Sequence, residues 1–563
     1  RRYGTVDELI DDLIRSRQGR TLHARPDTWR YRMGRFVRRH PVGLAFAALT
    51  LGLLSVYLVT LNLQARALER ERDRAQAEAA KARQVQSLVQ RLFEGIDPDI
   101  SGGEPLSVQA LLDRSFAQIE GELGAHPEVR AELLLTVGDV YQALGNRQRA
   151  EELLAQAQTL AEGLEAEQPL LAARVYRSRG RLLGEGNELA LPDELLARSL
   201  RLLRSATTGE SLQVAETLFQ FAELKRRQNL PEQAKAMGEE ALELRRAAGA
   251  DVLRIAASLN QLTMIERGLG RHAQAEGMLR ESLALMALRL PDAHPRIGEV
   301  KADLAMVLRR QGELEPALPL YLESIDALRS SRGQHHPSVG IVLGNLGNLY
   351  AQMDRLDEAE AAHREALLIH GMHFGARHAR VALAWNELGT SLRRRGKLEE
   401  AIEAFRKAVA ALPESHAAWN DAFRRNLIIA LIEAGQAQPA LEELSLAQRL
   451  LQEADHSDRD LAILHRWRAR AWLLAGDHQA SRSEALLAIE RFGTGEDGGP
   501  ALADCFHVLG EALLGLDKPA EGAEALRTAL SLYEGMTTPP TSAVTQVRSQ
   551  LERALARAHE RLP

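Results

Sequence analysis

The chain has 563 residues, more than a single hydrophobic core usually holds. Its 45% hydrophobic and 26% charged residues are ordinary for folded protein, and its wealth of Ala, Leu, Arg and Glu favours helix. The net charge of -6 supplies no overall basic field for nucleic acid, and the single cysteine, Cys505, excludes an internal disulfide and a cysteine-based zinc site.

An amphipathic helix is the first predicted element. Thr5 and Glu8 have the spacing of a capping box, in which each side chain bonds the backbone of the other residue. Four apolar residues then recur on one side of the helix: Leu9, Ile10, Leu13 and Ile14. Residues 3–20 resemble the interior of a domain, so we expect the chain to be the C-terminal part of a longer protein.

Residues 25–40 form a basic and aromatic segment. Trp29, Tyr31 and Phe36 alternate with arginines, a composition typical of the headgroup level of a membrane. A nucleic-acid patch is the alternative. Six arginines between residues 25 and 39, against four between 66 and 74, weakly favour an N-terminal side that faces the cytoplasm.

Residues 41–63 form a run of 23 residues without a charge. As a helix rising about 1.5 Å per residue, this run is long enough to cross a hydrocarbon core of roughly 30 Å. It is apolar on every face, whereas a buried globular helix, the alternative, is usually amphipathic. We therefore predict a single transmembrane helix at 41–63.

Residues 64–95 are rich in Ala, Arg, Glu and Gln, and we expect them to extend the helix as a stalk. An apolar residue recurs at every seventh position: Leu68, Ala75, Ala82 and Val89. The seam is thin, so a solvated stalk and a dimeric coiled coil, which would make the chain a homodimer, both remain open. Residues 96–130 are predicted to form a break and a capping helix.

From about residue 130 the chain repeats itself in ten units, spaced 39 to 42 residues apart. Three positions in the unit are nearly always small. The first holds Gly138, Gly180, Ala222, Thr263, Ala305, Gly347, Gly389, Ile428, Ala469 and Gly510. The second, twelve residues later, holds Ala150, Pro192, Ala234, Ala275, Ala317, Ala359, Ala401, Ala440, Ser481 and Gly522. The third, seven residues further on, holds Ala157, Ser199, Ala241, Ser282, Ser324, Ala366, Ala408, Ala447, Ala488 and Ala529.

Small residues at this spacing indicate two antiparallel helices whose backbones approach closely. Larger residues are expected to fill the gaps around the contact: Tyr141, Leu308, Tyr350, Leu392, Trp472 and Leu513 on the first helix, and Leu154, Leu279, Tyr321, Phe405, Leu444 and Leu526 on the second. A glycine often marks the turn between them: Gly145, Gly270, Gly312, Gly396, Gly435 and Gly476. Each pair buries one face on its neighbour, so the pattern predicts an all-α solenoid of about ten helix pairs at 131–535, closed by a capping helix at 536–563.

This pattern resembles the tetratricopeptide repeat (TPR) family, whose usual unit has 34 residues. The longer unit, with His-Pro at residues 126–127, 294–295 and 336–337, is similar to the variant of kinesin light chains and many bacterial signalling proteins. The resemblance covers about three quarters of the chain, with departures at Pro192 and Ile428. It implies a concave groove that binds a protein or peptide.

The N-terminal residues resemble the end of the C-lobe of bacterial Hanks-type serine/threonine kinases, here residues 1–24. The match rests on Arg2-Tyr3-Gly4-Thr5, Glu8-Leu9 and Asp12-Leu13. Such kinases often continue with a basic juxtamembrane segment, one span and a TPR ectodomain. Because this chain has no Gly-rich loop, HRD or DFG motif, the resemblance implies a kinase domain using ATP and magnesium before Arg1. It also implies an inner-membrane protein, cytoplasmic on its N-terminal side, with repeats in the periplasm or outside.

No motif within the chain predicts catalysis: Walker-type and H-E-x-x-H sequences do not occur. The densest histidine group consists of His363, His370, His373 and His378. His363 falls on a gap-filling position of its unit and the others lie in a join between units, so structural roles are favoured over a metal site. The glycine-rich run at 493–499 follows no strand and is predicted to be a loop between units, not a phosphate-binding loop.

A basic stripe is the candidate binding site. Arginines end the first helices of the central units, and asparagines lie on the same helices. By the TPR resemblance these residues line one edge of the groove: Arg226, Arg227, Asn260, Arg267, Arg309, Arg310, Asn345, Asn348, Asn386, Arg393 and Arg394. They would clamp an acidic peptide or a carboxylate and bond its backbone. The alternative is that the arginines are solvated and offset the helix macrodipole.

Three functions remain open. The chain is either the sensory, protein-binding region of a membrane-bound serine/threonine kinase, coupled through the span to the upstream catalytic domain, or a membrane-anchored TPR scaffold without kinase activity. A soluble repeat regulator with a buried apolar helix is the third. No nucleic acid is expected as a partner, and no cofactor for this chain itself.

Overall fold

The computed structural model describes residues 3–18, 20, 22–23, 28–39, 54, 57, 60–61, 64, 127–206, 211–413, 417–453, 457–493, 499–536 and 539–559. Every element in these ranges is a helix, which confirms the predicted all-α class. The chain divides into two compact units, residues 1–182 and 183–563.

Two helices lie near the N-terminus: α1 (Val6–Arg17) and α2 (Trp29–Arg39). The Thr5 hydroxyl accepts the backbone N–H of Glu8 at 3.3 Å, as a capping box requires. In a capping box the Glu8 carboxylate would also accept the backbone N–H of Thr5. This part of the prediction is wrong, because the carboxylate instead accepts the N–H of Gly4, at 2.7 Å. The cap therefore orders the chain from Gly4 onward.

No helix among the residues described is both long and apolar enough to cross a bilayer. Of the run at 41–63 only residues 54, 57, 60 and 61 are described, and each is helical. The predicted span, the stalk beyond residue 64 and the break up to residue 126 lie outside the described residues, so these three assignments stay predictions.

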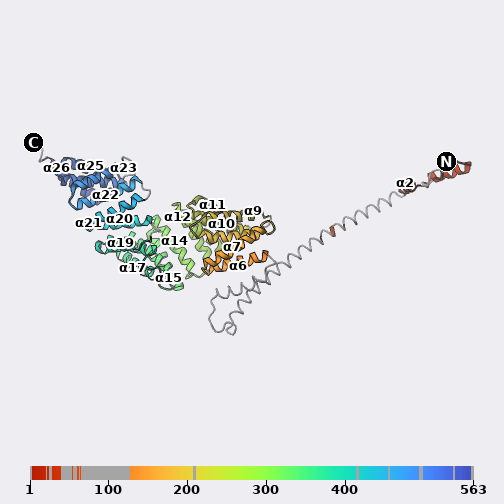
Figure 1. Cartoon of the computed structure of the whole chain (residues 1–563), viewed down its shortest axis with the longest axis horizontal. Helices are drawn as coiled ribbons and strands as arrows, with labels where there is room; N and C mark the ends of the chain where they lie inside the picture. Colours follow the sequence, from red (N-terminus) through yellow and green to blue (C-terminus); the bar gives the residue numbers. More distant parts are fainter. Residues whose placement is uncertain are drawn as a thin grey trace, which may run out of the picture. The chain divides into compact units, whose positions relative to one another are not determined.

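Ten helix pairs follow between residues 127 and 534, and Figure 1 shows them in succession along the chain. The first helices are α6 (Pro127–Ala143), α8 (Pro169–Gly184), α10 (Ser211–Arg227), α12 (Val252–Gly268), α14 (Pro295–Gln311), α16 (Pro337–Gln352), α18 (Ala379–Arg394), α20 (Ala417–Glu433), α22 (Asp458–Leu474) and α24 (Gly499–Gly515). The second helices are α7 (Arg147–Leu164), α9 (Ala190–Ser205), α11 (Pro231–Ala247), α13 (His272–Ala287), α15 (Leu314–Arg332), α17 (Leu356–Phe374), α19 (Leu398–Ala411), α21 (Ala437–Glu453), α23 (His478–Phe492) and α25 (Pro519–Glu534). A final helix, α26 (Thr541–His559), packs on α25.

The core of each pair is the predicted seam of small residues. All three small positions are buried in all ten pairs. The predicted gap-filling residues are buried beside them, except Tyr350 and Trp472, which are half-buried. In the pairs whose two helices lie within one compact unit, the seam therefore brings the helices together, and the larger side chains close the space around it.

At two of the first small positions, glycine lets a ring pack directly on the helix backbone. A Cβ added at Gly389 would lie 2.8 Å from the Phe405 ring, and one added at Gly347 would lie 2.4 Å from the His363 imidazole. Real Cβ atoms do not approach other atoms this closely, so the ring of the second helix packs directly on the backbone of the first.

The predicted turn glycines have left-handed backbone, which favours glycine. Gly396, with φ of 76°, has no atom within 4 Å of an added Cβ, so only the backbone opposes a side chain there. We expect Gly396→Ala to lower the free energy of unfolding by about 1–2 kcal/mol. Gly371→Ala, in the helical part of α17 and equally uncrowded, should raise it by about 0.5–1 kcal/mol. Urea unfolding followed by circular dichroism measures both, and an unchanged or raised free energy of unfolding for Gly396→Ala would contradict the turn geometry.

The two departures from the repeat pattern have different consequences. Pro192 lies in the first turn of α9, where backbone N–H groups have no partner within the helix, so the helix tolerates it. Ile428 is buried in α20, and α20 packs less closely on α21 than the helices of most other pairs pack on each other.

Candidate functional site

The first helices line one side of the second unit. Successive first helices contact one another at α14–α16, α16–α18 and α18–α20, whereas successive second helices contact each other less. The pairs therefore diverge on the side of the second helices. We call the opposite surface, formed by α10, α12, α14, α16, α18, α20, α22 and α24, the inner face.

Polar links join consecutive first helices across the centre of the inner face. They are Arg267–Asp303 (3.0 Å) between α12 and α14, Asn348–Glu387 (3.0 Å) between α16 and α18, and Asn386–Asn426 (2.9 Å) and Arg393–Glu433 (2.7 Å) between α18 and α20. Because the partners lie about one unit apart in the sequence, the repeat itself brings them together.

One step in this series has no such link. Within the part of the chain that the structure describes, no hydrogen bond or ion pair joins α14 to α16, although the two helices are in contact. Among the described residues, no carboxylate lies within ion-pair distance of Arg309 or Arg310 on α14, and none forms a hydrogen bond with the Asn345 side chain on α16. The Nε of Arg309 is buried without a partner, but the Arg309 guanidinium lies beside the buried Tyr321 hydroxyl and opposes the rise in its pKa that burial causes. We call Arg309, Arg310 and Asn345 the open step.

Burial shifts the acid groups around the open step. It raises the pKa of Asp303, although the Arg267 charge acts in the opposite direction. It raises the pKa of Glu387, against the hydrogen bond from Asn348 and the charge of Arg309. Charges interact more strongly in such poorly solvated surroundings than in water. A ligand carboxylate at Arg309 would therefore be attracted more strongly than one at a solvated arginine, and its own desolvation offsets part of this gain.

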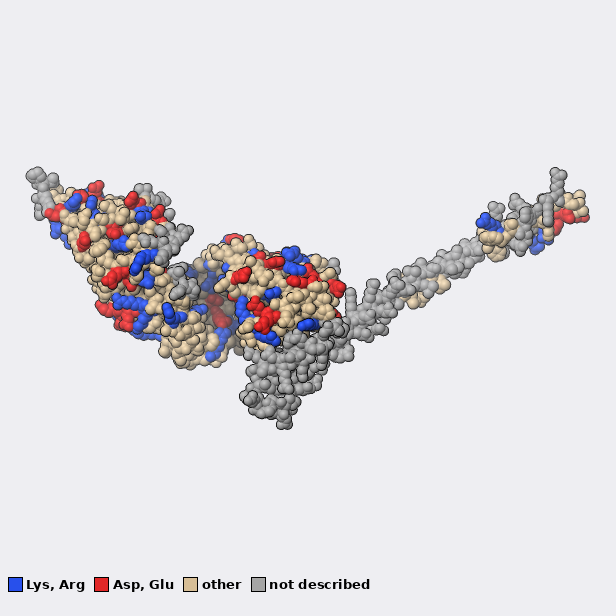
Figure 2. Space-filling model, viewed as in Figure 1, with Lys and Arg blue, Asp and Glu red and all other residues tan. Residues whose placement is uncertain are grey.

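The remaining arginines of the predicted stripe are already engaged. Arg226 pairs with Glu223 at 2.6 Å, Arg227 donates to the Gly186 carbonyl at 2.8 Å, and Arg394 donates to the Ala351 carbonyl and to Asp354 at 3.4 Å. Asn260 has a buried Oδ1 without a partner. Figure 2 likewise shows acidic and basic side chains interspersed over the repeats. The eleven residues thus do not form one continuous free basic stripe, and their role in binding stays a prediction.

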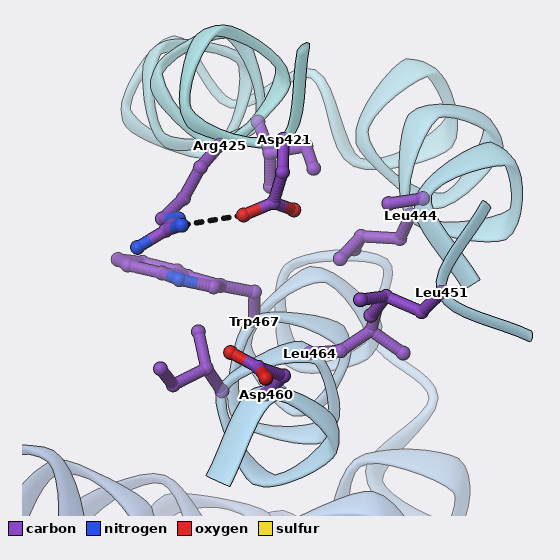
Figure 3. Close-up of a pocket in the computed structure, with 10 residues that line it drawn as sticks. Asp421, Arg425, Leu444, Leu451, Asp460, Leu464 and Trp467 are labelled. Atoms are coloured by element: carbon purple, nitrogen blue, oxygen red, sulfur yellow. Dashed lines mark hydrogen bonds and ion pairs between the residues drawn. The ribbon is translucent and has the colours of Figure 1, made fainter. Parts of the chain in front are cut away.

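A hollow of about 30 Å³ lies between α20, α21 and α22 (Figure 3). Ile428 lines it, and this bulky residue in place of a small one holds the two helices of its pair apart. Figure 3 shows Arg425 lying next to Trp467 and pairing with Asp421, at 2.5 Å. The Trp467 Nε1 is buried without a hydrogen-bond partner. The hollow has room for one or two water molecules but not for a ligand side chain.

Neither a metal-binding cluster nor a reactive cysteine is formed by the described residues. No group of three or more His, Cys, Asp or Glu side chains among them could hold a metal ion. Cys505 is buried, and burial raises the pKa of its thiol to about 12, so the thiolate that would act as a nucleophile is not formed.

The comparison with known families rests on the repeats. One sequence model of the tetratricopeptide repeat matches residues 254–330, 296–369 and 338–414, and another matches residues 131–163. The chain carries tetratricopeptide repeats. The match at 296–369 includes all three residues of the open step, so the candidate site lies within recognised TPR sequence.

No curated protein matches the chain. Solved structures similar to it include BtubC (BKLC) from P. vanneervenii, 24% identical over 40% of this chain and 93% of that one, with a TM-score of 0.37. A putative kinesin light chain from Podosopora anserina is 20% identical over 35% of this chain and 96% of that one, with a TM-score of 0.33. A tetratricopeptide repeat protein from Parabacteroides merdae is 16% identical over 53% of this chain and 98% of that one, with a TM-score of 0.36.

Proposed function

We infer that this chain acts through protein–protein interaction, the role that TPR repeats suggest. We propose that this chain binds a protein or peptide ligand on the inner face, and that the open step receives an acidic group of that ligand. The observation that supports this proposal is the interruption in the polar links. Among the described residues of α12 to α20, the step from α14 to α16 leaves Arg309 and Arg310 without a carboxylate partner, whereas polar side chains link the neighbouring steps.

The chemistry of the open step suits a carboxylate next to a peptide bond. Arg309 and Arg310 offer planar guanidinium groups, which bind carboxylates through paired hydrogen bonds. Asn345 offers both a donor and an acceptor, the set needed to bond one backbone amide of an extended peptide. The three side chains lie on two first helices, so a bound peptide would cross from one repeat to the next.

The proposal predicts that charge reversal at the open step abolishes binding of acidic peptides. Peptides selected from a random display library on the wild-type chain should be rich in Asp and Glu. Their affinity, measured by fluorescence anisotropy, should fall at least about 30-fold in Arg309→Glu/Arg310→Glu, because two charge-assisted hydrogen bonds are lost. The melting temperature should fall only slightly, since neither arginine has an ion pair to lose, although Arg309→Glu removes a favourable charge near Glu387.

Arg289→Glu/Arg449→Glu is the matched control. It makes the same change in net charge at two exposed arginines outside the first helices and should leave the affinity unchanged. Neutral selected peptides, or binding that survives reversal at the open step, would remove the support for this site.

We propose further that the repeats are the ligand-binding region of a membrane-bound serine/threonine kinase, anchored at 41–63 and coupled to an upstream domain that uses ATP and magnesium. This extends the resemblance of the N-terminal residues. It is supported by α1, whose apolar side is exposed in this chain, with Leu13 60% exposed, and would be covered by a larger domain. The proposed location is the inner membrane, with the N-terminal side in the cytoplasm, the repeats in the periplasm or outside, and pairing through the stalk.

The alternative is a membrane-anchored TPR scaffold. The coding sequence upstream of Arg1 separates the two. If that sequence encodes a Gly-rich loop, a Lys–Glu pair, HRD and DFG, it supports the kinase. If an initiator methionine lies shortly before Arg1, it supports the scaffold.

A further inference from the structure

Helix α2 has one apolar side that is open to solvent. Trp29, Met33, Phe36 and Val37 recur at the spacing of a single helix face. Their side chains are 70%, 52%, 53% and 45% exposed, respectively. Large apolar side chains concentrated on one side of a short helix usually mark a surface for association.

The remainder of α2 is basic. Five of its eleven residues are arginines and none is acidic. At about 100° per residue, the register positions 35, 38 and 39 of the helix, all arginine, fall on the side opposite Met33, and position 32 falls next to the apolar side. Arg30 lies at the border, with its guanidinium 5.8 Å from the centre of the Trp29 ring. The helix therefore combines an aromatic and aliphatic side with a charged side of a single sign.

We propose that α2 lies in the plane of a membrane surface, with its apolar side at the boundary of the acyl chains and its arginines on anionic headgroups. Trp and Phe on one side and arginines on the other are the composition of interfacial helices. Binding to nucleic acid would use the arginines but leave the four apolar side chains in water. The uncharged run at 41–63 begins directly after α2, so a bilayer entered by that run lies within reach.

This inference extends the membrane part of the proposed function and does not involve the peptide site. Its test compares two neighbouring positions of α2 in the full chain. Met33 is in the middle of the apolar side, whereas Gly34, about 100° away, has no atom within 4 Å of an added Cβ. A nitroxide is attached to Met33→Cys or to Gly34→Cys, each in a Cys505→Ser background, so that only one thiol reacts.

The labelled chains are incorporated into phosphatidylcholine vesicles with and without about 30% phosphatidylglycerol. Collision of the label with oxygen, which prefers the bilayer, is compared with collision with a water-soluble nickel chelate. In anionic vesicles the oxygen-to-nickel ratio at Met33→Cys should exceed that at Gly34→Cys by about fivefold or more, and the excess should shrink in neutral vesicles.

Equal ratios at the two positions in anionic vesicles would overturn the inference. An unchanged excess in neutral vesicles would overturn the role of the arginines. Flotation of the chain with the vesicles is measured in parallel and shows separately whether the chain is anchored in the membrane, as proposed for the run at 41–63. A chain that floats while both labels stay in water would disprove the role of α2 and leave the anchor standing, and a chain that does not float would disprove both.

Discussion

Acidification from pH 7 to pH 4 is expected to lower the free energy of unfolding by roughly 3 kcal/mol through His363 alone. This side chain is 1% exposed and lies between α16 and α18. One ring nitrogen contacts the Ser391 hydroxyl at 2.8 Å and the other contacts the Gly344 carbonyl at 3.2 Å. Burial lowers the pKa of His363 from 6.5 to about 4, and the hydrogen bond to Gly344 offsets only part of this shift.

The direction of the effect follows from proton binding. The unfolded chain takes up a proton at His363 near pH 6.5, whereas the folded chain resists protonation until about pH 4. The stability linked to this residue is therefore present above pH 6.5 and is lost as the pH falls towards 4. His370, one heptad further along α17, adds to the effect, because burial and the charges of Arg380, His378 and His373 lower its pKa to about 4 as well.

The next repeat supplies the control. Phe405 has the place of His363, and Ala430 has the place of Ser391. His363→Phe/Ser391→Ala thus installs a combination of side chains that the chain already uses one unit later. Urea unfolding at pH 7, 5.5 and 4 should show a smaller loss of stability in this variant than in the wild type. The same loss in both would mean that His363 does not titrate in this range.

Phe405→Ala is expected to lower the free energy of unfolding by about 3–5 kcal/mol. Phe405 is fully buried and packs on the backbone of α18 at Gly389. Because Gly389 has no side chain, nothing on that side can move in to fill the space left by the ring. The cavity therefore remains, and the loss should lie at the high end for a core truncation.

A second substitution at this contact shows whether the two positions act together. Gly389→Ala alone should cost about 1–3 kcal/mol, because its Cβ would lie 2.8 Å from the ring. In the Phe405→Ala background the same change should cost nothing, or stabilise α18 by about 0.5–1 kcal/mol as a helical glycine-to-alanine replacement does. A double-mutant cycle with urea unfolding measures the difference. Additive losses would show that Phe405 does not depend on the missing side chain at Gly389.

The helix pairs could be predicted because their packing is local and periodic. The repeat positions of Ala366 and Gly389 hold a small residue for the same reason in nearly every unit. Burial in the seam restricts the residue type there, and the spacing of these positions along the sequence is fixed. The left-handed turns were predictable where glycine stands, as at Gly312, but not at Asn229 or Asp354, whose polar side chains also tolerate this backbone.

The candidate site was less predictable, because the sequence pattern indicates where an arginine lies on a helix but not which carboxylate it meets. Arg267 and Arg309 occupy equivalent positions in neighbouring units. Arg267 pairs with Asp303, whereas the residue one unit after Asp303 is Asn345, which carries no charge for Arg309. Comparison of these positions from unit to unit is the signal that could have separated the open step from the rest of the stripe.

The open step lies on the fifth and sixth of the ten helix pairs, and this placement affects how it meets a ligand. In a linear repeat protein the terminal units have a neighbour on one side only, so spontaneous opening starts at the ends. A surface in the middle keeps its shape through most of these events. The ligand therefore meets side chains that are already in place, and little conformational freedom of the repeats is lost when it binds.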